Sequence, residues 1–219
     1  MSRAQNLKYK KYWRKTVLRG EWGNILLKEI ASAKPKNFLE IGVYCGVTAK
    51  NICELLNTIN NGDFAYYGCD LFGSQKLSSD NEIEPPAIEN NLKFSNPFKK
   101  IYYDLIMNEK INSIESITKF LSKFSKNINL IKGDTRLTLK EVPLQQIDYV
   151  FLDGGHSYNT VKSDMETLIK NLKKGSKVLC DDYYGVYKLD EVNKAINDVA
   201  NQYKINLKQK YERFAFFEI

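Results

Sequence analysis

The chain contains, at positions 38–48, the run Phe38-Leu39-Glu40-Ile41-Gly42-Val43-Tyr44-Cys45-Gly46-Val47-Thr48. An apolar segment ends in an acid and two glycines, and residues 49–57 then carry apolar side chains at helical spacing. This pattern predicts a strand, a tight glycine turn and a helix. Gly42 and Gly46 lack a Cβ, so the turn can approach a ligand closely, and Glu40 suits a ligand with an amine or hydroxyl groups.

The turn differs from the dinucleotide-binding fingerprint G-x-G-x-x-G because Tyr44 stands where that motif needs a glycine. The residues Glu-Ile-Gly-Val-Tyr-x-Gly at 40–46 instead resemble motif I of the class I S-adenosylmethionine-dependent methyltransferases. They look most like the catechol and caffeoyl-CoA O-methyltransferase branch. The resemblance implies S-adenosylmethionine as cofactor, with contacts from Glu40, Gly42, Tyr44 and Gly46.

Strand patterns alternate with helical patterns along the rest of the chain. We expect further strands at about 64–69, 128–132, 147–153, 177–182, 205–210 and 213–219, and helices at 114–124, 157–172 and 189–203. The alternation predicts an α/β fold with a doubly wound, seven-stranded, mostly parallel sheet. The family resemblance implies that this is the Rossmann-like methyltransferase fold. A length of 219 residues suits a single domain.

Each of the first five expected strands ends in an acid, namely Glu40, Asp70, Asp134, Asp153 and the pair Asp181-Asp182. The carboxyl ends of parallel strands share one edge of a sheet, where ligands bind, so we expect these acids to converge on one crevice. Asp70 is placed to accept hydrogen bonds from the two hydroxyls of a ribose, although an acid there could also cap the next turn.

The family resemblance extends the cofactor site. In related enzymes the acid after the third strand faces the adenine amino group, which implies that role for Asp134. The expected cofactor contacts also include Leu71, next to Asp70, and Thr135, next to Asp134.

Asp153, Asp181 and Asp182 predict a metal site. Three carboxylates in one place repel one another unless protons or a cation compensate, and a hard divalent ion with oxygen ligands, most simply Mg²⁺, would do so. The resemblance implies the same ligands: in metal-dependent catechol, caffeoyl-CoA and macrocin-type O-methyltransferases, an acid after the fourth strand and an acidic pair after the fifth bind the metal.

Asp153-Gly154-Gly155-His156 contains the only histidine of the chain. The catechol branch has a lysine three residues after the metal-binding acid, so this chain departs from its relatives here. We expect His156, with Asp153, to be catalytic: a neutral imidazole can take a proton from an acceptor hydroxyl. The alternative is that His156 binds the cofactor carboxylate or caps the helix that follows.

Residues 1–20 carry the whole net charge of +7, because seven basic residues and no acid precede Glu21. We expect residues 1–34 to form a basic helical extension, with helices at 5–19 and 22–33. Interleaved aromatics would suit nucleic acid, an acidic membrane surface or an anionic substrate. The alternative is a solvated helix whose aromatics pack on the domain.

Residues 73–110 are expected to form an insertion that acts as a lid or shapes the substrate site, with a helix at 98–107, although 74–97 could be a disordered loop. The acceptor would be a small hydroxylated molecule such as a sugar or a phenol. The alternatives are methylation of RNA or another polyanion held by the basic segment, and a non-catalytic module that only binds the cofactor.

Composition sets further limits. There is no apolar run near the roughly 20 residues of a membrane span and no signal-peptide core, so we expect a cytoplasmic protein. The cysteines Cys45, Cys53, Cys69 and Cys180 lack C-x-x-C spacing, which favours buried free thiols. Oligomerisation is possible and stays open.

Overall fold

A computed structural model describes residues 7–18, 20–73, 98, 101, 111–183 and 190–219. The expected lid and the expected helix at 98–107 lie almost wholly outside the described residues. Among the described helices, none combines the length and apolar character that crossing a membrane requires. All four cysteines are buried free thiols, as predicted.

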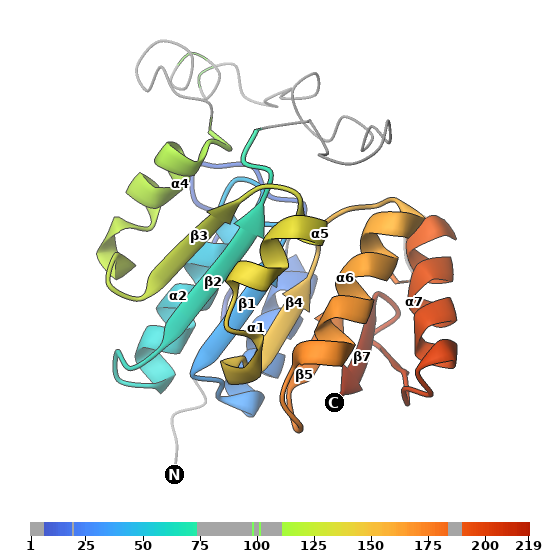
Figure 1. The fold of residues 1–219 in the computed structure, drawn as a ribbon. Helices are drawn as coiled ribbons and strands as arrows, with labels where there is room; N and C mark the ends of the chain where they lie inside the picture. The colour runs from blue at the N-terminus through green and yellow to red at the C-terminus, as the bar shows by residue number, and fades with distance from the viewer. Residues whose placement is uncertain (1–6, 19, 74–97, 99–100, 102–110, 184–189) are drawn as a thin grey trace.

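The described residues form one seven-stranded sheet in the order β3-β2-β1-β4-β5-β7-β6 (Figure 1). The strands are β1 (Asn37–Ile41), β2 (Ala65–Asp70), β3 (Ile128–Lys132), β4 (Tyr149–Leu152), β5 (Lys177–Cys180), β6 (Lys208–Lys210) and β7 (Phe214–Glu218). The first five pair in parallel, and β7 pairs antiparallel with β5 and β6. The predicted fold class is confirmed.

Helices cover both faces of the sheet (Figure 1). They are α1 (Gly20–Ala33), α2 (Val47–Ile59), α4 (Ile114–Phe120), α5 (Thr135–Thr138), α6 (Tyr158–Asn171) and α7 (Asp190–Gln202), with short 3₁₀ turns at Ser122–Phe124, Leu139–Glu141 and Leu144–Gln146. Side chains alternate between the faces of a strand, so Phe38 packs in the core under α1 and α2, and Leu39 packs in the core under α6 and α7.

The predicted helix at 5–19 is wrong for its described part, because residues 7–18 contain no helix. Their backbone bonds to side chains of other elements instead. The amide of Tyr9 donates to Asn24 Oδ1 (2.7 Å), and Lys10 exchanges two hydrogen bonds with the Asn51 side chain. These long-range bonds replace the local bonds that a helix needs, so the segment lies as an irregular strap on the domain.

Aromatic and basic side chains anchor this segment. The buried Tyr9 ring packs on Gly23, and its hydroxyl lies 2.7 Å from Thr48 Oγ1 at the start of α2. Arg14 is also buried; it donates to the carbonyl oxygens of Cys45 (2.7 Å) and Ile111. One of the seven basic residues is therefore a structural clamp on the glycine turn.

Candidate active site

The glycine turn connects β1 to α2, where β2 and β4 flank β1 on its two sides and the strand order reverses. Gly42 and Gly46 have φ angles of 93° and 76°, and Tyr44 between them has a φ of 54°. A Cβ built on Gly42 would lie 1.9 Å from the main-chain oxygen of Asp153. Only glycine allows this contact between the turn and the end of β4, so Gly42 ties the cofactor side of the crevice to the acid side.

Asp70 holds the turn in shape. Its Oδ2 accepts the amides of Val43 (2.8 Å) and Tyr44 (2.9 Å), and its Oδ1 accepts the amide of Phe72 (2.7 Å). Burial raises the pKa of Asp70, and the three amide bonds act against that rise. A carboxylate offers about four acceptor positions, and the described residues fill three, which leaves one on Oδ1 for a ligand hydroxyl. The capping alternative is thus observed, and the ribose contact stays a prediction.

Glu40 lies beneath the turn, with no exposed surface. It follows Phe38 on the face covered by α1 and α2, and its Oε2 accepts the hydroxyl of Tyr66. Its Oε1 has no hydrogen-bond partner among the described residues. Burial raises the pKa of Glu40 to about 8. The expected convergence of every strand-end acid on one open crevice is not seen for Glu40, whose contact with a ligand stays a prediction.

Asp134 caps the short helix α5. Its Oδ1 accepts the amide of Arg136 (3.0 Å), and the Arg136 guanidinium donates to both carboxylate oxygens. The structure thus gives Asp134 a cationic partner, and its contact with adenine stays a prediction. Thr135 begins α5, and the half-buried Leu71 directly follows β2. Both residues lie close to the carboxyl edge of the sheet.

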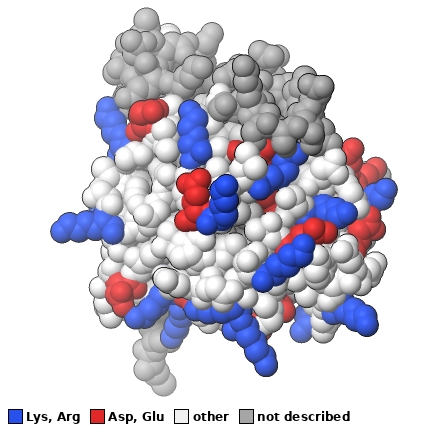
Figure 2. Space-filling view, viewed as in Figure 1, with Lys and Arg blue, Asp and Glu red and all other residues white. Residues whose placement is uncertain are grey.

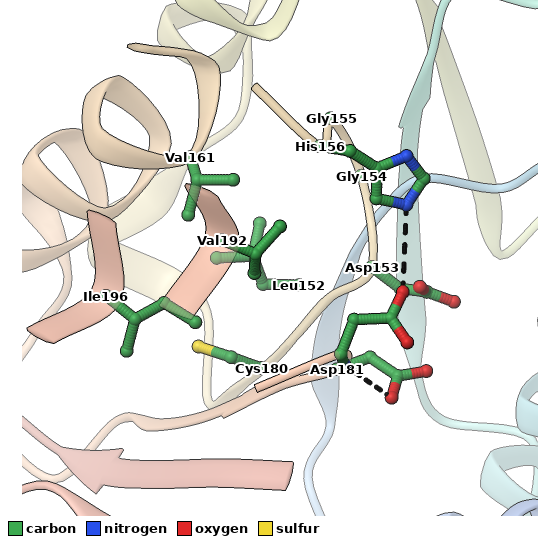
Figure 3. A pocket seen from close by; sticks show the side chains of 11 residues that line it. Leu152, Asp153, Gly154, Gly155, His156, Val161, Cys180, Asp181, Val192 and Ile196 are labelled. Carbon is green, nitrogen blue, oxygen red and sulfur yellow. Dashed lines mark hydrogen bonds and ion pairs between the residues drawn. The ribbon is translucent and has the colours of Figure 1, made fainter. Parts of the chain in front are cut away.

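Asp153 and Asp181 directly follow β4 and β5 and come together at the carboxyl edge (Figure 3). With Asp182 they form what we call the acid trio, which lines a hollow that also includes His156. Burial raises the pKa of Asp153 well above its ordinary value, and the charges of Asp181 and Asp182 raise it further. The predicted convergence is therefore confirmed for these three acids.

Arg213, which sequence reasoning missed, supplies the counter-charge. Its Nε donates to Asp181 Oδ1, and its Nη2 donates to Asp181 Oδ2 at 2.7 Å and to Asp182 Oδ1 at 3.2 Å. Burial raises the pKa of Asp181 to about 6 although Arg213 acts to lower it, so the carboxylate is ionised at neutral pH beside its guanidinium. The only sequence signal is a basic residue just before the apolar strand β7.

The acid trio does not fit a magnesium ion in this arrangement. Mg²⁺ binds carboxylate oxygens at about 2.0–2.1 Å in near-octahedral geometry. Both oxygens of Asp181 and one of Asp182 already accept guanidinium N–H groups. No group of three His, Cys, Asp or Glu side chains within the described ranges is arranged to hold a metal.

His156 faces the acid trio, with its Nε2 3.7 Å from Asp182 Oδ2. Its side chain is 37% exposed, so it can reach a ligand. The helix-cap alternative does not apply, because Ser157 itself caps α6 by accepting the amide of Thr160. Figure 3 shows the imidazole and the carboxylates of Asp153 and Asp181 on one side of the hollow, and Val161, Val192 and Ile196 as an apolar wall on the other.

Comparison with known proteins agrees with this geometry. Residues 39–183 match a family model described as a methyltransferase domain. No curated protein matches the sequence.

Three solved structures resemble the fold. The O-methyltransferase NovP has a TM-score of 0.62 at 14% identity, over 88% of this chain and 78% of that one. The SAH-bound methyltransferase PaMTH1 of Podospora anserina has a TM-score of 0.56 at 14% identity, over 91% and 78%. CalS11, a TDP-rhamnose 3'-O-methyltransferase of calicheamicin biosynthesis, has a TM-score of 0.56 at 18% identity, over 92% and 81%. The family model covers well over half of the chain, so this protein belongs to the class I S-adenosylmethionine-dependent methyltransferase family.

Proposed function

We propose that the protein transfers a methyl group from S-adenosylmethionine to a hydroxyl oxygen of a small acceptor such as a sugar or a phenol. The observation that carries this proposal is the placement of His156 beside Asp182 in a hollow at the carboxyl edge of β4 and β5. This hollow lies next to the glycine turn, because Gly42 contacts the main chain of Asp153. Two fold relatives, NovP and CalS11, are named as O-methyltransferases, which is consistent with an oxygen acceptor.

The residues of the glycine turn fit the cofactor. Gly46 is the N-cap of α2 and provides no side-chain cap, so the first amides of the helix suit the cofactor carboxylate. The free acceptor position of Asp70 suits a ribose hydroxyl, and Tyr44 and Leu71 would flank the nucleoside. The bound cofactor supplies an electrophilic methyl group on a positively charged sulfur. In this proposal Asp134 and Thr135 mark the adenine end of the site.

His156 would act as the general base. The bound cofactor would supply the methyl group that the acceptor oxygen displaces from sulfur, and an imidazole nitrogen of His156 would take the hydroxyl proton. Asp182 would stabilise the imidazolium that results, because its Oδ2 lies 3.7 Å from Nε2. Asp153 would hold the acceptor from the same side of the hollow as His156. Alignment of the two reactants supplies a further part of the rate enhancement, up to about 7–11 kcal/mol in well-oriented systems.

Magnesium assistance, expected from the sequence, is not part of this mechanism. Arg213 donates to both oxygens of Asp181 and to one oxygen of Asp182, three of the carboxylate oxygens that the ion would need. Methylation of a polyanion is not favoured either, since Arg14 is buried in a structural role. Figure 2 shows basic and acidic side chains intermixed over the visible face, which carries α5 and α6.

The test is transfer of isotopically labelled methyl from S-adenosylmethionine to a panel of sugars, phenols, amines and RNA, with EDTA present. The proposal predicts label on hydroxyl oxygen of a small acceptor. Label on amines or RNA alone would assign a different acceptor class. Cofactor binding without transfer to any acceptor would favour the non-catalytic module.

A further inference from the structure

Three acidic side chains in one recess require a compensating proton or cation. Asp153, Asp181 and Asp182 lie on adjacent strand ends, and Asp181 is only 3% exposed. Carboxylates at such short range and low exposure cannot all stay ionised unless a cation lies among them. The described residues identify that cation.

The sheet itself fixes the position of Arg213. β7 pairs antiparallel with β5, and Cys180 lies opposite Ala215. Continuing this register places Arg213 opposite Asp182, and the amide of Tyr183 donates to the Arg213 carbonyl at 3.0 Å. The side chain is 9% exposed, so it is held by backbone pairing and packing rather than placed freely at the surface.

The contacts of Arg213 are those of a two-pronged clamp. Nε and Nη2 engage the two oxygens of Asp181, and Nη2 also reaches Asp182 Oδ1 at 3.2 Å. A planar guanidinium matches a carboxylate in this way, and a lysine does not. Asp182 then has Oδ2 left for His156. One chain of contacts therefore runs from Arg213 through Asp182 to His156.

We propose that Arg213 is the built-in counter-cation of the acid trio, that it takes the place of a divalent metal ion, and that it positions Asp182 beside His156. Arg213 is thus a positioning residue. Its effect on turnover rests on the proposed function, whereas its exclusion of a metal does not. Removing the guanidinium would leave the three carboxylates free to bind a hard cation.

The experiment is a Mn²⁺ titration of the full chain, followed by electron paramagnetic resonance, without cofactor or acceptor. Variants are Arg213→Met, Arg213→Lys, Arg213→Met with Asp181→Asn, and the control Lys210→Met. Lys210 lies on the same hairpin, but its partner is Glu29. We expect no saturable binding by the wild type or by Lys210→Met, and at least about tenfold tighter binding by Arg213→Met. The added Asp181→Asn change should abolish that gain. Arg213→Lys should bind Mn²⁺ more weakly than Arg213→Met, because it keeps the positive charge although it cannot engage both oxygens of Asp181.

Saturable Mn²⁺ binding by the wild type that Asp181→Asn removes would overturn the proposal, and so would a folded Arg213→Met variant that gains no affinity. If Arg213→Met fails to fold in thermal unfolding assays, the wild-type titration still decides. A second readout is methyl-transfer activity. We expect Arg213→Met to lose activity and Mg²⁺ to restore part of it, which a merely structural role of Arg213 would not produce. Absence of transfer in the wild type would count against the proposed function and leave the titration result standing.

Discussion

The amide nitrogen of Tyr44 lies 2.9 Å from Oδ2 of Asp70, and this hydrogen bond joins the glycine turn to the end of β2. Asp70 also accepts the amides of Val43 and Phe72. One carboxylate thus fixes the backbone on both sides of the expected nucleoside site. The shape of the proposed cofactor site therefore depends on Asp70, whose carboxylate already accepts three hydrogen bonds from the protein backbone.

Asp70→Ala should therefore weaken cofactor binding. Three amides lose their acceptor, and each lost hydrogen bond to a charged group costs up to about 3 kcal/mol. We expect affinity for S-adenosylhomocysteine, measured by calorimetry, to fall at least about tenfold. The control is Asp63→Ala, which removes a surface acid paired with Lys36. Equal affinities for both variants would show that Asp70 does not shape the site.

Glu40 should make stability depend on pH. Burial raises its pKa from 4.5 to about 8, so the folded state keeps a proton that the unfolded state has lost between these values. Stability from this group is therefore lost as pH rises from about 4.5 to about 8, by an amount on the order of 5 kcal/mol. Glu40→Gln should flatten the dependence of the free energy of unfolding on pH in this range, measured by urea unfolding without cofactor. A change in stability that is equal at every pH does not affect this test.

Glu54 should make stability depend on pH in the opposite direction to Glu40. Burial acts to raise its pKa, but the hydrogen bond from Lys10 and the positive charges of Lys10 and Lys50 outweigh burial and lower it. Its contribution is present at neutral pH and is lost as pH falls through the folded pKa. Glu54→Gln should thus lower stability at neutral pH and have less effect in acid. Identical pH profiles for Glu40→Gln and the wild type would refute the assignment for Glu40.

Gly23→Ala should destabilise the protein although it lies in a helix, where alanine is normally favoured by about 1 kcal/mol. A Cβ at this position would lie 2.3 Å from Cγ of Tyr9 and 2.7 Å from its Cβ, so the strap of residues 7–18 must move. Overpacking of this kind costs about 1–3 kcal/mol.

A double-mutant cycle isolates that contact. Tyr9→Gly removes both the ring and the Cβ that lies 2.7 Å from the added methyl group, and Gly23→Ala should then be neutral or stabilising in thermal unfolding. Additive effects of the two changes would mean that the strap does not pack on α1 as described.

His156→Ala should lower turnover by about 10²-fold, the usual contribution of a general base, with little change in affinity for S-adenosylhomocysteine. The matched control is Ser157→Ala, which removes the cap of α6 and should cost about 1 kcal/mol of stability without affecting turnover at a permissive temperature. Unchanged turnover in His156→Ala would assign the histidine to ligand positioning instead.

The sequence predicts the sheet well because its strongest signals are local. The run at 38–48 combines apolar alternation with two glycines, and the structure confirms the strand, turn and helix there. The strap at 7–18 escapes prediction because its partners, such as Asn51 for Lys10, lie far away in sequence. The spacing of Tyr9, Tyr12 and Trp13 is compatible with a helix, and the sequence does not reveal the distant side chains that bind this segment instead.

The site is predicted only in part for the same reason. The prediction that Asp153, Asp181 and Asp182 lie close together is correct, because the topology of the sheet alone places the ends of their strands side by side. The burial of Glu40 follows from the alternation of side chains along β1, which a rule based on strand ends ignores. Arg213 reaches Asp181 because β7 pairs antiparallel with β5, and the two residues are 32 positions apart in the sequence. No local sequence pattern predicts this contact.

A crystal structure of the protein with S-adenosylhomocysteine, grown with Mg²⁺ present, tests the central claim most directly. We predict the ligand over the turn from Gly42 to Gly46, its ribose within hydrogen-bond reach of Asp70 Oδ1 and its sulfur facing the hollow beside His156. Ligand bound elsewhere, or a hollow beside His156 that the sulfur does not face, would contradict the account.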